Sequence, residues 1–168
     1  MNKKQISLLA AFVAAKVEYT VVGGVAVNAH GYVRATNHLD IFIRPTEENA
    51  RAAFGALLAL GVPLEGLQPS DLLDEEENLR FGPEEDHIDI LASIGEMPFD
   101  QVWRNRIETE VEGLTVPFIS KADLIENKRQ VGRLRDLADA EELGSFQTRE
   151  GPDAGGEGEY PSDWRPFV

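Results

Sequence analysis

Apolar residues follow two different spacings along the chain, and each spacing predicts a kind of secondary structure. Between residues 6 and 17 they recur at nearly helical intervals, which predicts an amphipathic first helix. Two short runs rich in β-branched and other apolar residues come next, at 19–22 and 39–43, and each predicts a strand. Between these runs, residues 25–30 have the length and composition of a short helix. The N-terminal part of the chain therefore predicts alternating helices and strands.

The alternation continues to about residue 143. Thr46 is a suitable N-cap for a helix that stops at Gly61. The further predicted elements are a helical turn at 69–73, strands at 78–81 and 87–91, a short helix at 99–104, a hairpin at 107–119, and helices at 121–131 and 134–143. From residue 144 glycine, proline and acidic residues dominate, so residues 144–168 are expected to form a flexible acidic tail. We therefore predict a single α/β domain over residues 1–143.

Two aspartates interrupt apolar strands, Asp40 in the run 39–43 and Asp89 in the run 87–91. A carboxylate inside such a strand is costly unless it is hydrogen-bonded, paired with a cation or bound to a metal. One interpretation is structural, with Arg34 or Arg80 as ion-pair partners. The functional interpretation is a shared Mg²⁺ site, because Mg²⁺ prefers carboxylate oxygens and keeps substrate phosphates in its other positions. We predict that both aspartates line one site on adjacent strands.

Gly23 and Gly24 follow the first predicted strand and precede the short helix. They can serve as a tight connection, or their missing β-carbons can let a triphosphate approach backbone N–H groups at the start of the helix. Basic residues cluster much later, at 121–135. This cluster is either a solvated face that pairs with nearby acidic residues or a place that holds phosphates. The residues alone leave both alternatives open.

The glycine pair, the Asp40 strand and the Asp89 strand together resemble the polymerase-β-like nucleotidyltransferase superfamily. Its mark is a Gly-Gly or Gly-Ser turn, then Asp-x-Asp on one strand and a third Asp on another. The segment 22–43, which contains Arg34-Ala35-Thr36, and the later segment 124–139 are similar to small bacterial members related to AbiEii-type toxins. The resemblance covers roughly residues 6–143 and implies a mixed β-sheet flanked by helices.

In that family the first two acids hold metal ions, and the third lies beside the attacking hydroxyl. The resemblance therefore implies that Asp40 binds Mg²⁺ or Mn²⁺ and that Asp89 activates the acceptor. It also implies that the Gly23-Gly24 turn, Lys128 and Arg133 bind the nucleotide. The implied reaction transfers a nucleoside monophosphate from a nucleoside triphosphate to a hydroxyl on RNA, a protein or a small molecule. An antitoxin-type protein partner is a further implication of the likeness to toxins.

His38 stands where the family pattern has its first Asp. Imidazole is a neutral ligand that suits Zn²⁺, Mn²⁺ or Ni²⁺ better than Mg²⁺, and it adds no negative charge. We therefore expect His38, Asp40 and Asp89 to form either a weakened catalytic metal site or a site for a different metal. The alternative is a catalytically inactive relative that binds nucleotide or a protein partner. Of the other histidines, His30 is expected to be structural and His87 to lie on the surface.

Composition narrows the partners and the compartment. The 168 residues carry a net charge of −14, and residues 65–89 contain ten acidic residues and one arginine. Such a surface repels nucleic acid at long range, so a small nucleotide suits it better than a long duplex. The chain has no cysteine, which fits a cytoplasmic enzyme and excludes disulfides and thiolate metal sites. Its apolar stretches fall short of the roughly 20 residues that cross a membrane, so no membrane contact is expected.

Overall fold

The computed structural model describes residues 1–145, which form one mixed α/β domain. Its elements are α1 (Lys3–Ala14), β1 (Tyr19–Val22), α2 (Gly23–Ala29), β2 (Leu39–Ile43), α3 (Glu47–Ala59), η1 (Pro69–Leu73), β3 (Leu79–Phe81), η2 (Glu84–Asp86), β4 (Ile88–Leu91), α4 (Phe99–Asn105), β5 (Ile107–Val111), β6 (Leu114–Phe118), α5 (Lys121–Val131) and α6 (Leu134–Ser145). The predicted fold class, a mixed sheet flanked by helices, is confirmed. Of the predicted tail, residues 144 and 145 end α6, and the remainder lies outside the described residues.

Within residues 1–145 the sheet has six strands, in the order β3-β4-β2-β1-β6-β5. Strand β1 pairs antiparallel with β2 and parallel with β6, and β2 pairs parallel with β4. The edge strands β3 and β5 are each antiparallel to their neighbour. Every residue of β1 is buried, and so is every residue of β2 except Asp40. Because successive side chains point to opposite faces, both faces of the sheet are covered at its centre.

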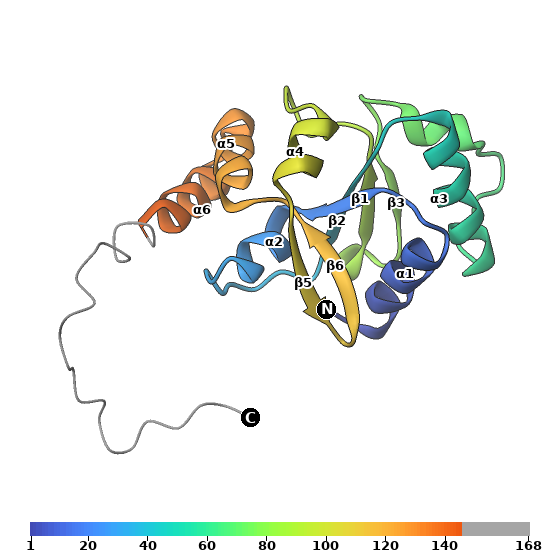
Figure 1. Ribbon diagram of the computed structural model, residues 1–168, viewed down its shortest axis with the longest axis horizontal. Helices are drawn as coiled ribbons and strands as arrows, with labels where there is room; N and C mark the ends of the chain where they lie inside the picture. Colours follow the sequence, from blue (N-terminus) through green and yellow to red (C-terminus); the bar gives the residue numbers. More distant parts are fainter. Residues whose placement is uncertain (146–168) are drawn as a thin grey trace, which may run out of the picture.

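The helices lie around the sheet in two groups. Helices α5 and α6 pack side by side at one end of the molecule, and α1 and α3 pack together at the other end (Figure 1). The short α2 contacts β1, β2 and α5, so it joins the first strand pair to the C-terminal helices. Elements from both ends supply residues that are completely buried in the core: Leu9, Phe12, Val21, Ile41, Leu57 and Leu124.

Helix α1 begins and ends three residues earlier than the predicted helix. Its start is fixed by a capping box, in which the Asn2 side chain accepts a hydrogen bond from Gln5 N and the Gln5 side chain accepts one from Asn2 N. Its end precedes Lys16, which adopts a left-handed φ of 55°. The apolar spacing therefore located the helix, and the caps determined its bounds. The predicted N-cap Thr46 is confirmed for α3, where its side chain accepts a hydrogen bond from Asn49 N.

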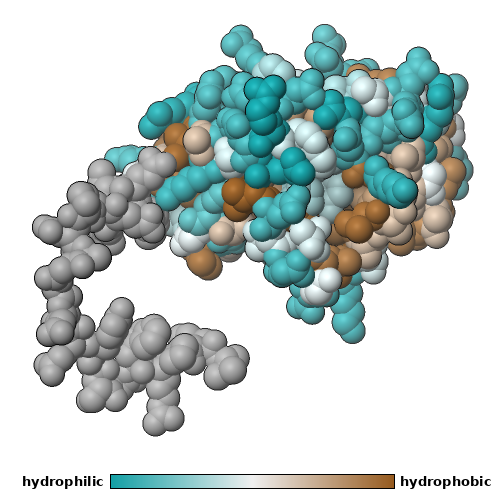
Figure 2. All heavy atoms as spheres, viewed as in Figure 1, coloured by the Kyte–Doolittle hydropathy of each residue, from teal (hydrophilic) through white to brown (hydrophobic). Residues whose placement is uncertain are grey.

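The visible face of the molecule is largely hydrophilic and carries only small, separate apolar patches (Figure 2). Among the large apolar residues of the described part of the chain, Val33 and Leu134 are the most exposed, at 81% and 89% of their surface. No helix within residues 1–145 has the length and apolar character needed to span a bilayer.

Candidate functional site

Asp40 and Asp89 lie directly opposite each other on neighbouring strands. Strand β2 runs parallel to β4, and the pairing register places Asp40 against Asp89. Side chains at paired positions lie on the same face of a sheet, so the two carboxylates are neighbours, as the sequence predicts. Both line a cavity of about 580 Å³ whose wall also includes the Gly23-Gly24 turn and residues of β3, α5 and α6.

The Gly23-Gly24 turn is packed too closely against this site to carry side chains. Gly23 has a left-handed φ of 64°, and a β-carbon there would overlap the Asp40 carboxylate, lying 2.8 Å from its Cγ. A β-carbon on Gly24 would lie 2.7 Å from Thr36 Oγ1. The chain can leave β1 beside Asp40 only because both positions are glycine. The turn thus forms part of the wall of the cavity.

Asp89 is held by an arginine from the neighbouring edge strand. Arg80 stands opposite Asp89 in the antiparallel pairing of β3 with β4. Its Nε lies 2.7 Å from Oδ1 and its Nη2 lies 2.8 Å from Oδ2, so one guanidinium engages both carboxylate oxygens. The Asp89 side chain is 7% exposed, whereas the Arg80 side chain is 60% exposed. The structural interpretation, an ion pair with Arg80, therefore describes Asp89 as it stands.

Asp40 differs from Asp89 because nothing within residues 1–145 hydrogen-bonds or forms an ion pair with its carboxylate. Burial raises the pKa of Asp40, and the neighbouring charge of Asp89 raises it further. Charges on His38, His87 and Lys128 oppose this rise but do not cancel it. Asp40 is thus a half-buried, uncommitted carboxylate beside a cavity, which is typical of a functional residue.

The structure corrects the expectation that His87 lies on the surface. Its side chain is 8% exposed, with Nδ1 3.0 Å from Glu84 O and Nε2 3.5 Å from Asp89 Oδ2. The hydrogen bond from Leu39 N to His87 O begins the pairing of β2 with β4 and brings His38 onto His87, with ring centroids 3.7 Å apart. The sequence signal was the period-2 spacing that puts His87 on the same face as Asp89.

Lys128 lines the cavity, but its charge is already balanced. Its Nζ lies 2.7 Å from Asp136 Oδ1 and 2.9 Å from Asp139 Oδ2. Asp139 also accepts hydrogen bonds from Arg34 Nε and Nη2, both at 2.7 Å. Burial would raise the pKa of Asp139, but the hydrogen bonds and charges of Arg34 and Lys128 outweigh burial and lower it. This buried network fixes the segment before β2 against α5 and α6.

Two further arginines of the basic cluster face the cavity. Arg135 Nη2 donates to Ala35 O at 2.9 Å. Arg133 is exposed, and within the described part of the chain its guanidinium has neither an ion pair nor a hydrogen bond. Of the basic residues that the sequence proposes for phosphate contact, Arg133 is therefore the one whose charge is uncommitted, and Lys128 is the one whose charge is engaged.

The donor set as arranged does not fit a divalent cation. Both oxygens of Asp89 face the Arg80 guanidinium, and His38 supplies a neutral nitrogen in place of a carboxylate. Within residues 1–145, no three His, Cys, Asp or Glu side chains are grouped so that they could hold a metal ion. The expected metal site of His38, Asp40 and Asp89 stays a prediction.

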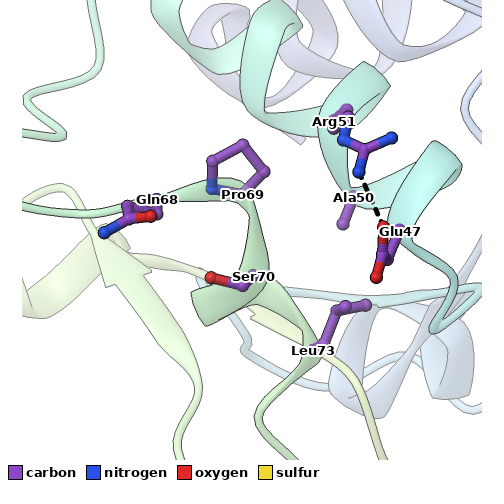
Figure 3. A pocket seen from close by; sticks show the side chains of 7 residues that line it. All are labelled: Glu47, Ala50, Arg51, Gln68, Pro69, Ser70 and Leu73. Carbon is purple, nitrogen blue, oxygen red and sulfur yellow. Dashed lines mark hydrogen bonds and ion pairs between the residues drawn. The ribbon is translucent and has the colours of Figure 1, made fainter.

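His30 and a second hollow are weaker candidates for a functional site than the cavity beside Asp40. His30 Nε2 lies 2.8 Å from Ile119 O, a contact that joins α2 to the chain after β6. The second hollow lies between α3 and η1, with a volume of about 270 Å³ (Figure 3). Its charged groups are Glu47 and Arg51, which lie one turn apart on α3. They form an exposed ion pair in which Arg51 Nη2 lies 2.6 Å from Glu47 Oε2. Such exposed pairs are common on helix surfaces, so the Asp40 cavity is the stronger candidate.

Comparisons with known proteins add one finding. No protein-family model matches the chain, and no curated protein matches its sequence. Among solved structures it is similar to the solution structure of the antibiotic-resistance factor ANT(2'')-Ia. The similarity covers 89% of this chain and 94% of that one, with 17% identity and a TM-score of 0.44. A likeness at this level assigns no substrate and no catalytic residue here, and the AbiEii-type resemblance stays a prediction.

Proposed function

We propose that this chain is a nucleotidyltransferase, which transfers a nucleoside monophosphate from a nucleoside triphosphate to a hydroxyl acceptor and releases pyrophosphate. The observation that carries the proposal is the placement of Asp40 opposite Asp89 on the wall of a 580 Å³ cavity. Asp40 is partly buried beside the charge of Asp89 and has no hydrogen-bonded partner within residues 1–145, which is costly to the fold, so a chemical role is the better explanation for it.

The cavity offers the features that a triphosphate needs. Its volume of about 580 Å³ is in the usual range for small-molecule sites. Arg133 supplies an uncommitted guanidinium, which is suited to bidentate phosphate contacts. The Gly23-Gly24 turn lines the same cavity at the start of α2, where backbone N–H groups are free of partners within the helix and suit phosphate oxygens. Lys128 would attract the phosphates through its positive charge and without direct contact, since its Nζ is already bound by two carboxylates.

The resemblance implies Asp89 as the activator of the acceptor, but Arg80 engages both of its oxygens, so we assign the proton to Asp40 instead. In the proposed reaction the acceptor hydroxyl donates a hydrogen bond to the Asp40 carboxylate, and its oxygen attacks the α-phosphorus. The proton passes to Asp40 as the new P–O bond forms and the bond to pyrophosphate breaks. Because burial raises the pKa of Asp40, its carboxylate is a stronger base than an exposed one. Positioning of the two substrates supplies the remainder of the acceleration.

Mg²⁺ or Mn²⁺ belongs to this proposal only as an expectation from the resemblance. A bound divalent cation would neutralise charge that develops on the phosphates. The residues as arranged do not fit such a cation, because Arg80 occupies both oxygens of Asp89. We therefore assign the metal no step in the reaction.

The alternative is an inactive relative that binds nucleotide without transferring it. Two observations favour this alternative: the Asp89 carboxylate is neutralised by Arg80, and His38 replaces the first acid of the family pattern. The two candidates share the nucleotide site and differ in whether the α-phosphate moves to an acceptor. An assay of label transfer therefore separates them.

The test uses two labels on the same nucleotide. Each nucleoside triphosphate, labelled with ³²P at the α- or the γ-phosphate, is incubated with the protein, Mg²⁺ or Mn²⁺, and a cell extract. Nucleotidyl transfer places α-label on an acceptor and releases γ-label as pyrophosphate. Asp40→Asn should abolish the labelled acceptor, and Glu47→Gln, at the second hollow, should leave it unchanged.

Three outcomes are informative. Acceptor that carries α-label and depends on Asp40 supports the proposal. Saturable nucleotide binding without labelled acceptor supports the inactive alternative. Acceptor that carries γ-label instead would mean phosphoryl transfer, and the proposed reaction would be wrong.

A further inference from the structure

An apolar groove lies apart from the Asp40 cavity, at the end of the molecule that carries α1 and α3 (Figure 1). It is formed by the start of α1, the residues after α3 and the end of β3, and its volume is about 490 Å³. Most of its surface is apolar, and solvent still reaches Leu60, Val62 and Phe81 in its lining. Exposed apolar surface in a hollow of this size is typical of a site that another segment covers.

The rim of this groove is positively charged. Lys3 and Lys4 are exposed in the first turn of α1, and within residues 1–145 neither ammonium group has an ion pair or a hydrogen bond. Among the lining residues the acidic one is Asp86, which accepts hydrogen bonds from both side chains of the α1 capping box. Glu84 and Glu85 lie nearby along the chain but do not line the groove. The groove therefore suits apolar anchors that are flanked by negative charge.

The part of the chain that follows α6 has this composition. Residues 157–168 contain three acidic residues and one arginine, and three aromatic residues are spaced among them: Tyr160, Trp164 and Phe167. Aromatic side chains bury large apolar areas and supply most of the binding energy where a segment docks. The preceding residues 151–158 include four glycines and one proline, which is the composition of a linker.

This segment is long enough to reach the groove. Helix α6 ends at Ser145, at the opposite end of the molecule from α1 and α3 (Figure 1). A compact domain of this size has a diameter of about 40 Å, so a path around half of it is about 60 Å long. Trp164 lies 19 residues beyond Ser145, and an extended chain of that length spans roughly 60–70 Å. Because both partners belong to one chain, their effective concentration is high and weak contacts suffice.

We propose that the groove is the docking site for the chain's own residues 157–168. Trp164 and Phe167 occupy its apolar part, and the acidic residues of the segment lie beside Lys3 and Lys4. Among the described residues the groove and the Asp40 cavity have no lining residue in common, so the docked segment leaves the cavity open. This surface therefore serves an interaction that is separate from the proposed reaction.

The experiment uses the full chain with one nitroxide label. The chain has no cysteine, so Ser162→Cys provides a single attachment point between Tyr160 and Trp164. Backbone N–H signals of the ¹⁵N-labelled protein are compared with the nitroxide oxidised and reduced. We expect the signals of Gly61 and Phe81 at the groove to lose more than half of their intensity. Gly113 should keep its signal, because it lies in the β5–β6 turn at the opposite edge of the sheet from β3.

Variants of both partners complete the test. Trp164→Ser should weaken the docking equilibrium about thirtyfold, through the loss of one buried aromatic anchor, and restore the groove signals. Lys3→Glu combined with Lys4→Glu should weaken it about fivefold, and the new glutamates suit the first turn of a helix, so α1 is kept. Lys16→Glu is the matched control, because Lys16 is exposed just beyond the other end of α1. Without any nitroxide, Trp164→Ser should also shift the signals of Gly61 and Phe81.

A mixed sample separates docking within one chain from docking between two copies. Nitroxide-labelled chains without ¹⁵N are mixed with ¹⁵N-labelled chains without nitroxide, and the groove signals should keep their intensity. Equal broadening in the mixed sample would mean that a second copy supplies the segment, and the site within one chain would be wrong. Groove signals that keep their intensity in the singly labelled chain and do not shift in Trp164→Ser would also overturn the proposal. These readouts use no nucleotide, so they stand or fall independently of the proposed function.

Discussion

Replacing Gly23 by alanine tests how the turn and the carboxylate fit together. Gly23 has a φ of 64°, and a β-carbon there would overlap the Asp40 carboxylate. The alanine variant therefore combines a backbone penalty with a steric one. Two other glycines separate these penalties. Gly61 has a φ of 74° and open space, with no atom within 4 Å of the place a β-carbon would take, whereas Gly24 lacks a positive φ but faces Thr36 Oγ1 at 2.7 Å.

The expected magnitudes follow from this geometry. A left-handed backbone costs an L-residue roughly 1–2 kcal/mol, and this is the whole expected loss for Gly61→Ala. For Gly23→Ala we expect a loss of about 2–3 kcal/mol in the free energy of unfolding, because the new methyl group must also displace Asp40. The displacement is limited, since the Asp40 carboxylate has no hydrogen bond within residues 1–145 to break. Gly24→Ala should lower the free energy of unfolding only through the clash of its β-carbon with Thr36.

The assay is urea unfolding of the three variants at neutral pH, followed by calorimetry with inorganic triphosphate. Gly23→Ala should lose triphosphate binding because the methyl group and the shifted Asp40 enter the cavity, whereas Gly61→Ala should bind as the wild type does. The reasoning is refuted if Gly23→Ala is no less stable than Gly61→Ala and binds triphosphate normally. Asp40 would then not lie against the turn.

Two carboxylates give predictions of opposite sign for stability. Asp40 has a folded-state pKa above its unfolded value, so its ionisation removes stability as pH rises from the unfolded to the folded pKa. Asp40→Asn should therefore be more stable than the wild type at neutral pH in urea unfolding, and a loss of stability would contradict a functional role. Asp139 has a lowered pKa because the charges and hydrogen bonds of Arg34 and Lys128 outweigh its burial. Its ionised form therefore stabilises the fold above the unfolded pKa, and this stabilisation is lost as pH falls through the folded pKa. Asp139→Asn should destabilise by about 3 kcal/mol at neutral pH, because Arg34 loses its carboxylate partner and the buried Lys128 keeps Asp136 alone. The variant should also flatten the acid limb of the stability profile, and equal profiles for the two proteins would contradict this account.

Local sequence patterns were sufficient to predict most of the fold. The runs Tyr19–Val22 and Leu39–Ile43 are strands with the predicted bounds, because apolar, β-branched residues fill a sheet that is covered on both faces. The bounds of α1 were wrong by three residues, because the capping box of Asn2 and Gln5 starts the helix before its apolar stripe begins. At the ends of a helix, capping hydrogen bonds between near neighbours therefore determine the bounds more strongly than the spacing of apolar residues does.

The site was less predictable, because its decisive contacts join distant segments. The interruption of two apolar strands predicted that Asp40 and Asp89 line one site on adjacent strands, but only the register of β3 shows that Arg80 covers Asp89. The burial of His87 likewise depends on the pairing of β2 with β4, which brings His38 onto its ring. Partner choice among several arginines and carboxylates is set by tertiary packing, and spacing along the chain does not encode it.

Locating a bound nucleotide by ¹⁵N NMR is the most direct test of the central claim. A non-hydrolysable nucleoside triphosphate is titrated into the labelled protein while the backbone N–H signals of Gly23 and Gly24 and the side-chain Nε–H of Arg133 are followed. The account predicts saturable shifts of these three signals with one common affinity, because all three residues line the Asp40 cavity. Signals of Arg51 at the second hollow should stay in place. Shifts centred on Arg51, or no saturable shift at the Gly23-Gly24 turn, would contradict the account.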